Sequence, residues 1–259
     1  MPDLASSESN LLAGRVALVT GAGVGIGRAV ALALGRRGAR VGIHYHRSSD
    51  GAAEVLEALR QCGTEGLLLP ADLTSEAEAH RVVDRLVEAW GRLDILVNNA
   101  GSPLARTSIE QCSLDLWQQA LAVNVTSAFL VTRRAIPYLR ASGRGAIVNN
   151  LSLSVQTGGA GGAGPYAAAK GALQVLTRTL ARELAPQVRV NAVMPGVIET
   201  RHHEVFSTPQ RMAEYRSETP LGRNGCAEEV AEAVAFLASD AAGFITGAIL
   251  DINGGRFLR

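Results

Sequence analysis

The chain contains a single lysine. Of its 25 basic residues, 24 are arginine, and Lys170 is the exception. A guanidinium is planar and stays protonated, whereas an ammonium is a compact charge whose pKa responds to its surroundings. A chain that otherwise uses arginine throughout therefore indicates that position 170 needs the chemistry of an ammonium.

Cysteine, long apolar runs and net charge are also scarce. Cys62, Cys112 and Cys226 are odd in number, far apart and without metal-ligand spacing, which favours free thiols in a reducing compartment and no metal site. No apolar run approaches the roughly 20 residues that span a bilayer, and residues 1–10 are polar rather than signal-like. A net charge of +1 gives no reason to expect nucleic acid or a membrane surface as a partner. We therefore expect a cytoplasmic protein that acts on small molecules.

What the chain does have is an alternation of short apolar runs with amphipathic stretches. Its 47% hydrophobic content is that of a globular protein, and its 259 residues suffice for one large α/β domain. We expect residues 1–10 to form a tail and residues 11–259 one domain, in which residues 196–225 break the alternation. The strands are expected at 15–20, 39–45, 66–70, 93–97, 146–151, 189–193 and 248–252, and the helices at 26–37, 51–61, 75–90, 113–140, 166–184 and 227–239. This order predicts a parallel sheet with helices on both faces.

A glycine-rich turn follows the first predicted strand. Gly21, Gly23, Gly25 and Gly27 are interleaved with small or apolar residues, and a helical pattern starts at once. Glycines let the main chain approach a pyrophosphate closely, and the helix start attracts negative charge. We expect Val24 and Ile26 to take part in this dinucleotide site.

The end of the second strand is where a dinucleotide fold distinguishes NAD from NADP. The chain has Tyr45, His46, Arg47 and Ser48 there, without the carboxylate that usually holds the NAD ribose. An arginine, a histidine and a hydroxyl suit a 2′-phosphate, so NADP(H) is preferred and NAD(H) stays possible. In the alternative, Arg47 is only a solvated loop charge.

The next predicted strand ends at Asp72 and Leu73, which are further candidates for the cofactor site. Asp72 is placed either to contact an adenine edge or only to start the next helix.

Tyr166 and Lys170 are four residues apart with three alanines between them. Both side chains are expected on one face of a helix. A positive charge beside a phenol favours the phenolate, so the tyrosine is a candidate general acid or base. In the alternative, the pair is accidental and lies on a surface helix.

The chain resembles the short-chain dehydrogenase/reductase family from about Leu12 to Gly255. The matching motifs are Thr20 to Gly27, Asn98 to Gly101, Asn124, Ser152, Tyr166 with Lys170, and Pro195-Gly196. The resemblance implies a single Rossmann-type domain of seven parallel strands, commonly assembled as a homotetramer or a dimer.

The resemblance also implies roles. Tyr166 would exchange a proton with the substrate oxygen while hydride moves to or from the nicotinamide, and Lys170 would hold the nicotinamide ribose and lower the pKa of Tyr166. Ser152 would hydrogen-bond the carbonyl oxygen, and Asn124 would connect Lys170 to solvent through water. The remaining cofactor residues implied are Asn99, Ala100, Gly101, Pro195, Gly196, Ile198 and Thr200.

The chain departs from the family pattern in two places. The serine usually lies thirteen residues before the tyrosine, where this chain has Leu153. We choose Ser152, which ends the strand, and keep Ser154 as the alternative. The second departure is the glycine-rich loop 158–165, which either makes room for a bulky or polar substrate or is an insertion without function.

We therefore predict an NADP(H)-dependent oxidoreductase that interconverts a carbonyl and a secondary alcohol. Residues 196–200 and 245–247 look similar to those of 3-oxoacyl-carrier-protein reductases, and residues 44–48 are similar to the cofactor loop of pteridine reductases. In a reductase of sugar or uronate keto acids, Arg201, His202 and His203 would meet a carboxylate or hydroxyls. A cofactor-sensing Rossmann regulator without catalysis is the alternative from a different class.

Overall fold

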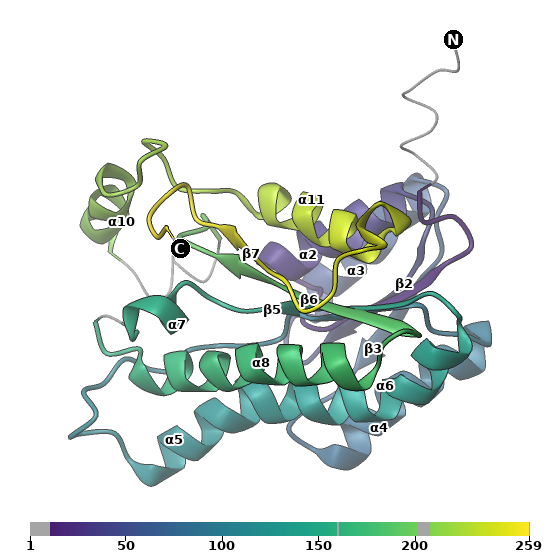
Figure 1. Cartoon of the computed structure of the whole chain (residues 1–259), viewed down its shortest axis with the longest axis horizontal. Helices are drawn as coiled ribbons and strands as arrows, with labels where there is room; N and C mark the ends of the chain where they lie inside the picture. Colours follow the sequence, from purple (N-terminus) through teal and green to yellow (C-terminus); the bar gives the residue numbers. More distant parts are fainter. Residues whose placement is uncertain (1–10, 160, 201–207, 259) are drawn as a thin grey trace.

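The computed structural model describes residues 11–159, 161–200 and 208–258 and contains one seven-stranded parallel sheet (Figure 1). Its order is β3-β2-β1-β4-β5-β6-β7. Successive strands are added toward one edge from β1 to β3 and toward the other edge from β4 to β7, so the strand order reverses between β1 and β4. The strands are β1 (Val16–Val19), β2 (Arg40–Tyr45), β3 (Gly66–Pro70), β4 (Ile95–Asn98), β5 (Gly145–Asn150), β6 (Val188–Pro195) and β7 (Ile249–Ile252). Every paired neighbour is parallel, which confirms the predicted Rossmann-type α/β fold.

Helices cover both faces of the sheet (Figure 1). One layer consists of α2 (Gly25–Arg36), α3 (Ser49–Gln61) and α11 (Ala227–Ala238). The opposite layer consists of α4 (Glu76–Trp90), α6 (Ser127–Ala141) and α8 (Gly164–Glu183). Each layer packs its own apolar core against the sheet, and the central strands β1 and β4 are buried along their whole length.

The helix expected over 113–140 is interrupted. It consists of α5 (Leu114–Leu121), a π-helical turn at Ala122–Thr126 and α6. Inside the turn, the Asn124 amide donates to the carbonyls of Ala120 and Ser102, at 2.9 and 2.7 Å, and its oxygen accepts from the Ser102 amide. A side chain that inserts into the main-chain ladder in this way interrupts a regular α-helix.

Within the described part of the region 196–225, the structure has one helix that the sequence did not predict. It is α10 (Pro209–Ser217), which begins where the Thr208 hydroxyl accepts from the Arg211 amide. A second unpredicted helix is the single turn α7 (Ser154–Thr157). The expected tail at residues 1–10 and the expected substrate residues 201–203 lie outside the described residues.

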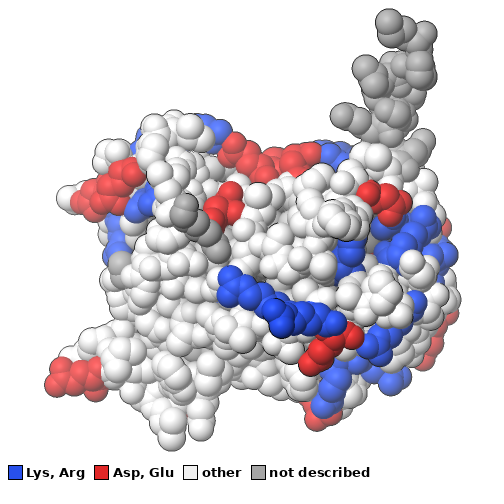
Figure 2. Space-filling model, in the orientation of Figure 1, with Lys and Arg blue, Asp and Glu red and all other residues white. Residues whose placement is uncertain are grey.

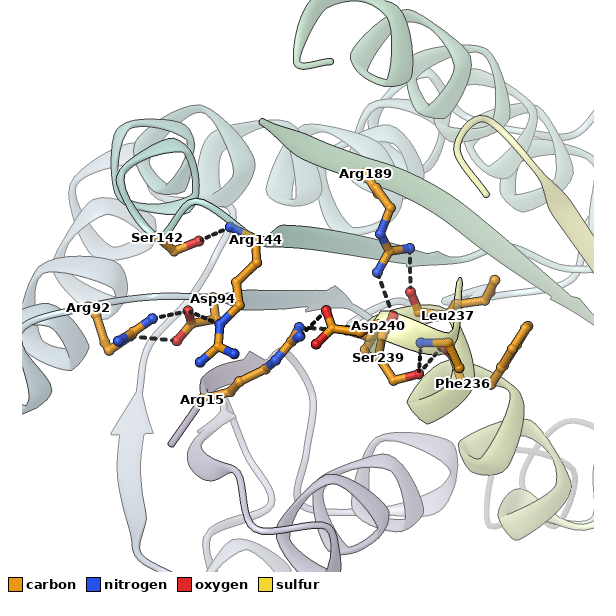
Figure 3. Close-up of polar contacts among 12 residues, drawn as sticks. Arg15, Arg92, Asp94, Ser142, Arg144, Arg189, Phe236, Leu237, Ser239 and Asp240 are labelled. Atoms are coloured by element: carbon orange, nitrogen blue, oxygen red, sulfur yellow. Dashed lines mark hydrogen bonds and ion pairs between the residues drawn. The ribbon is translucent and has the colours of Figure 1, made fainter. Parts of the chain in front are cut away.

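An ionic cluster ties the amino ends of the strands together (Figure 3). The fully buried Asp94 accepts from the main-chain amide of Val16 and from the guanidinium of Arg92, both at 2.9 Å. Arg15, also buried, bonds Asp240 and a carbonyl at the end of α11. This cluster lies at the edge of the sheet opposite the candidate site and fixes α11 to the strands.

Charges of both signs are interspersed on the surface shown in Figure 2, and a broad part of that face is uncharged. Within the described ranges, no helix is long and apolar enough to cross a lipid bilayer.

Candidate active site

The carboxyl ends of β1, β4, β5 and β6 open into a cavity of about 500 Å³. Ligands of open α/β sheets bind at such an edge, where the strand order reverses. Seventeen of the predicted site residues line the cavity: Gly21, Val24, Gly25, Ile26, Gly27, His46, Ser48, Asn99, Ala100, Gly101, Ser152, Tyr166, Lys170, Pro195, Gly196, Ile198 and Thr200.

The glycine turn after β1 has no room for a side chain at Gly23 or Gly27. Gly21 and Gly25 have φ values of +64° and +54°. A Cβ on Gly27 would lie 2.1 Å from the carbonyl oxygen of Gly21, and one on Gly23 would lie 2.3 Å from the hydroxyl of Ser48. Glycine at these two positions therefore lets the start of α2 pack closely against the turn and lets the turn approach Ser48.

Hydrogen bonds from β4 hold this turn. The amide group of Asn99 donates to the carbonyls of Thr20 and Gly21, at 2.9 and 3.1 Å. The Thr20 hydroxyl accepts from the main-chain amides of Asn99 and Ala100. The predicted Asn98 to Gly101 motif thus positions the glycine turn from the neighbouring strand.

His44 has a structural role that the sequence did not reveal. Its Nδ1 accepts from the amide of Gly21 at 3.0 Å, and its Nε2 lies 3.2 Å from the carbonyl of Ala71. The first contact requires an unprotonated Nδ1, so Nε2–H donates to the second. Burial lowers the pKa of His44 to about 4. His44 is therefore neutral near pH 7 and adds no positive charge to the cofactor site.

Five predicted cofactor residues are not among those that line the cavity: Gly23, Tyr45, Arg47, Asp72 and Leu73. Arg47 is exposed. The Asp72 carboxylate accepts from the amide and hydroxyl of Thr74, at 3.0 and 2.7 Å, and these bonds lower its pKa. Asp72 is thus bonded to Thr74 in the turn before α4, whose N-cap residue is Ser75.

Lys170 is 2% exposed and projects from α8 into the cavity wall. Its ammonium donates to the carbonyl of Asn150 at 2.6 Å and lies 5.8 Å from the centre of the Tyr166 ring. The two side chains share a helical face, as predicted. Burial lowers the pKa of Lys170 to about 8, so the ammonium is mostly charged at pH 7.

Tyr166 differs from the expectation of a lowered pKa. Burial raises the pKa of its phenol, and a hydrogen bond with Ser152 acts in the opposite direction. Tyr166 is therefore protonated at neutral pH, which is the state of a proton donor.

Ser152 and Ser154 both line the cavity, but only Ser152 bonds Tyr166. Ser154 donates from its hydroxyl to the oxygen of Ser152 at 2.9 Å, and its main-chain amide lies 3.2 Å from the same oxygen. Since the Ser152 oxygen accepts from Ser154, its own proton is directed elsewhere. This arrangement favours Ser152 as the residue that faces the substrate.

Asn124 does not line the cavity, although it lies directly behind the wall. Its side chain is fully buried and is engaged with Ser102 and Ala120 as described above. A Cβ on Gly101 would lie 2.6 Å from Asn124 Oδ1 and 3.1 Å from Lys170 Nζ. Gly101 thus separates the asparagine from the lysine.

Several lining residues were missed by the sequence analysis. Asn150 is 7% exposed, and its side-chain oxygen is buried without a hydrogen-bond partner in the described structure. Arg106, Tyr215 and Arg256 also line the cavity. Arg106 and Arg256 lie in loops and Tyr215 lies on α10, and none of these segments has a periodic pattern of apolar residues from which its position could be predicted.

The residues present fit a nicotinamide dinucleotide. The glycine turn brings the start of α2 to the cavity, where its main-chain amides suit a pyrophosphate, and the side-chain oxygen of Asn150 is an acceptor without a partner among the described residues. For a metal, no group of three His, Cys, Asp or Glu side chains with suitable geometry occurs among the residues that the structure describes.

Comparison with known proteins agrees with this site. A family model described as enoyl-(acyl carrier protein) reductase matches residues 21–256. The chain belongs to the short-chain dehydrogenase/reductase family, and it is an oxidoreductase of that family.

Two curated relatives match almost end to end. The chain is 37% identical to the uncharacterized oxidoreductase YgfF of Escherichia coli, over 93% of this chain and 99% of that protein. It is 39% identical to the 3-oxoacyl-[acyl-carrier-protein] reductase FabG of Pseudomonas aeruginosa, over 95% and 99%.

Among solved structures, the NADH-dependent reductase A1-R′ responsible for alginate metabolism is similar, with a TM-score of 0.87 and 36% identity over 96% of this chain and 99% of that one. A further structure of that reductase is complexed with NAD.

Proposed function

We propose that this oxidoreductase reduces a small-molecule carbonyl to a secondary alcohol, or runs the reverse reaction, with NADP(H) preferred over NAD(H). The observation that carries the proposal is the placement of Ser152, Tyr166 and Lys170 on one cavity whose other wall is the glycine turn. The catalytic groups and the dinucleotide cradle thus share one space.

The residues have distinct tasks. When bound, the nicotinamide supplies or accepts hydride at the substrate carbon. Ser152 donates a hydrogen bond to the substrate oxygen and stabilises the charge that develops there. Tyr166 gives its phenolic proton to that oxygen during reduction. Lys170 holds the nicotinamide ribose, and its charge stabilises the phenolate that remains.

Asn124 is proposed to position this lysine. It holds the loop at Ser102, and Gly101 lies between its side chain and the ammonium. The π-turn opens the helix at this point, as a water path from Lys170 to solvent requires.

A direct assay with three classes of substrate tests this proposal. Ketones, 3-oxoacyl thioesters and oxo sugar acids are offered with NADPH and with NADH, and loss of the reduced cofactor is followed by absorbance. Reduction of at least one class by the wild type, and its loss in Tyr166→Phe, is the expected result. A Tyr166→Phe protein that turns over normally contradicts the mechanism.

The 3-oxoacyl-carrier-protein reductase is retained as a second candidate because the relative of that name is 39% identical over nearly the whole chain. Reduction of the thioesters far faster than the other classes identifies this activity. A cofactor-sensing regulator, in contrast, binds NADPH and reduces none of the three classes.

The NADP(H) preference is supported by the residues after β2. His46 and Ser48 line the cavity, and Arg47 lies exposed between them. The reductase A1-R′ is named NADH-dependent, so this preference is a property in which the chain is proposed to differ from that protein.

We also propose a homotetramer or dimer that works in the cytoplasm. Exposed apolar side chains occur on both layers and on the last strand: Phe129, Val175, Phe236 and Leu250. The face that carries α8 and β7 is broadly uncharged (Figure 2), as a subunit interface requires. Light scattering on the purified protein measures the number of subunits.

The location in the cytoplasm is supported by the thiols, since the free cysteines Cys62, Cys112 and Cys226 suit a reducing compartment.

The segment of about 196–225 is proposed to close over the substrate. Its described part supplies Ile198, Thr200 and Tyr215 to the cavity.

A further inference from the structure

We infer that Arg256, in the segment that follows β7, is a positioning residue that holds the helix α10 over the substrate end of the cavity. The inference rests on the proposed function, because it assumes that the segment of about 196–225 closes over a substrate. Arg256 thereby sets the affinity for the substrate without touching the reacting atoms.

The helix α10 has little packing of its own. None of its nine residues is buried, and only Arg211, Met212 and Tyr215 are partly covered. A helix of this length is marginal in water, and most of the stability of helices in proteins comes from tertiary contacts. The place of α10 therefore depends on contacts made from this one face.

Tyr215 is the residue of α10 that lines the cavity. The Nε of Arg211 donates to the Tyr215 hydroxyl at 2.6 Å. A Cβ on Gly161 would lie 2.2 Å from Nη2 of the same arginine, so this guanidinium lies against the glycine-rich loop. Because that loop joins Ser152 to Tyr166, Tyr215 lies toward the end of the cavity that holds the catalytic groups.

Arg256 makes three contacts with the end of α10. Its Nη1 donates to the main-chain carbonyl of Tyr215 at 3.1 Å, and its Nη2 pairs with the carboxylate of Glu218 at 2.6 Å. Its guanidinium carbon lies 4.9 Å from the centre of the Tyr215 ring. The last carbonyls of a helix lack partners within the helix, and an arginine can bond them. Arg256 lines the cavity as well, but these bonds engage its guanidinium with α10.

Arg256 is itself fixed to the sheet. It follows β7 after a turn in which its amide donates to the carbonyl of Asn253 at 3.2 Å. The buried side chain of Asn253 donates to the carbonyl of Phe257 at 3.0 Å, and its oxygen accepts from the amide of Gly255 at 2.9 Å. The main chain at Arg256 therefore has a fixed position relative to β7.

The same turn lies directly against the chain that leaves α10 (Figure 1). The amide of Leu221 donates to the carbonyl of Gly254 at 3.1 Å. Gly254 has a φ of +63°, and a Cβ there would lie 2.6 Å from the side chain of Thr219. A side chain at position 254 would therefore separate the two segments. Arg256 adds the bonds that reach the helix itself.

The catalytic groups belong to other elements. Ser152 follows the buried strand β5, and Tyr166 and Lys170 belong to α8. Release of α10 therefore moves Tyr215 away from the cavity and leaves the proton donor and the lysine in place. Such a change raises KM and leaves kcat largely intact, which separates this role from one in the chemical step.

The experiment measures amide hydrogen exchange of α10 in the protein saturated with NADP⁺, and KM and kcat for a substrate found in the assay above. Exchange reports local opening and needs no turnover. The variants are Arg256→Gln, Arg256→Lys and Glu218→Gln, with Arg216→Gln as the matched control. Arg216 also lies on α10, but its side chain is 55% exposed and its guanidinium is 3.9 Å from Glu199.

Arg256→Gln is expected to speed exchange in α10 and to raise KM, each by about tenfold, because it removes a charge-assisted pair and the ring contact. We expect kcat to stay within about twofold of the wild type, and the affinity for NADP⁺ to be unchanged. Arg256→Lys keeps the charge without the fork and is expected to show a smaller effect. The control is expected to match the wild type.

Glu218→Gln tests whether Arg256 acts through the helix. Glu218 is exposed and is not among the residues that line the cavity. It is expected to raise exchange and KM by a smaller factor than Arg256→Gln, because the bond to the Tyr215 carbonyl remains. In the Arg256→Gln background, Glu218→Gln is expected to have no further effect, since the interaction between the two residues is already lost.

Exchange in α10 that stays at the wild-type rate in Arg256→Gln overturns the inference. If KM rises while exchange is unchanged, Arg256 contacts the substrate directly, and the inference is equally wrong. An equal effect in Arg216→Gln also overturns it, because any lost arginine would then loosen the helix. Faster exchange in Arg256→Gln from a wild type that reduces no substrate refutes the proposed function and leaves Arg256 as the residue that holds α10. Reduction with an unchanged KM, despite faster exchange, leaves the proposed function standing and refutes the link to substrate affinity.

Discussion

The ammonium of Lys170 donates a 2.6 Å hydrogen bond to the carbonyl of Asn150, at the end of β5. The amide group of Asn150 donates to the side-chain oxygen of Asn99 at 2.9 Å. Asn99 in turn donates to the carbonyls of Thr20 and Gly21. One series of hydrogen bonds therefore runs from the glycine turn to the lysine, so the groups that shape the cofactor cradle also position the charge beside Tyr166.

Lys170→Arg is expected to lower kcat by about 100-fold or more. The site is 2% exposed, and a planar guanidinium cannot occupy the place of a compact ammonium without moving its neighbours. Steady-state kinetics with a substrate from the panel measure the loss, and thermal unfolding shows whether the variant is folded. Activity close to that of the wild type would remove the case for a required lysine.

Ser152→Ala and Ser154→Ala are expected to differ. Loss of the hydroxyl that bonds the substrate oxygen should lower kcat by about 100-fold for Ser152. Ser154→Ala removes one hydrogen bond to the Ser152 oxygen, and a fall of less than about tenfold is expected. Each variant serves as the control of the other, and a larger loss in Ser154→Ala assigns the catalytic role to that serine.

Arg47→Ser is expected to weaken NADPH binding by about tenfold and to leave NADH binding unchanged, because only NADPH carries the 2′-phosphate. Calorimetric titration of each cofactor into the wild type and the variant measures both affinities. Arg28→Ser is a suitable control, since its partly exposed guanidinium belongs to α2 and lies 3.5 Å from Glu54. Tighter binding of NADH than of NADPH by the wild type refutes the preference.

Asp94→Ala is expected to destabilise the fold by about 3 kcal/mol. The substitution removes the buried carboxylate that accepts from Val16 and Arg92, and it leaves a buried main-chain amide without a partner (Figure 3). Chemical denaturation measures the free energy of unfolding. Asp84→Ala, which removes a partly exposed partner of Arg134, should change it by less than about 1 kcal/mol.

The sequence predicted the strands closely because β1, β4 and β5 are short apolar runs buried on both faces, a local signal. It also placed Tyr166 and Lys170 on one face, since the spacing in a helix fixes that. The helix α10 has no buried residue and no periodic pattern of apolar residues, so the sequence gave no signal from which to predict it. For the same reason the packing of Arg211 and Arg256 on the ring of Tyr215 was not foreseen, because contacts between distant segments depend on the whole fold.

The role of His44 was missed for a related reason, and the pH dependence of stability tests it. In the folded protein its pKa is about 4, against 6.5 for a free histidine. The folded state thus binds fewer protons than the unfolded state between these values. The stability that the neutral ring contributes is fully present above pH 6.5 and is lost as the pH falls toward 4. The shift corresponds to roughly 3 kcal/mol in total, of which about 2 kcal/mol is lost by pH 5.

The test uses His44→Gln, because an amide can accept from Gly21 and donate to Ala71 without titrating. Free energies of unfolding are measured by reversible denaturation at pH 7 and pH 5 for the wild type, for His44→Gln and for the control His46→Gln, whose ring is exposed. Acidification should destabilise the wild type and His46→Gln by about 2 kcal/mol more than it destabilises His44→Gln. Since all three proteins share the same carboxylates, equal losses would mean that His44 is not the group that titrates, and its neutral ring would then not be what holds the glycine turn.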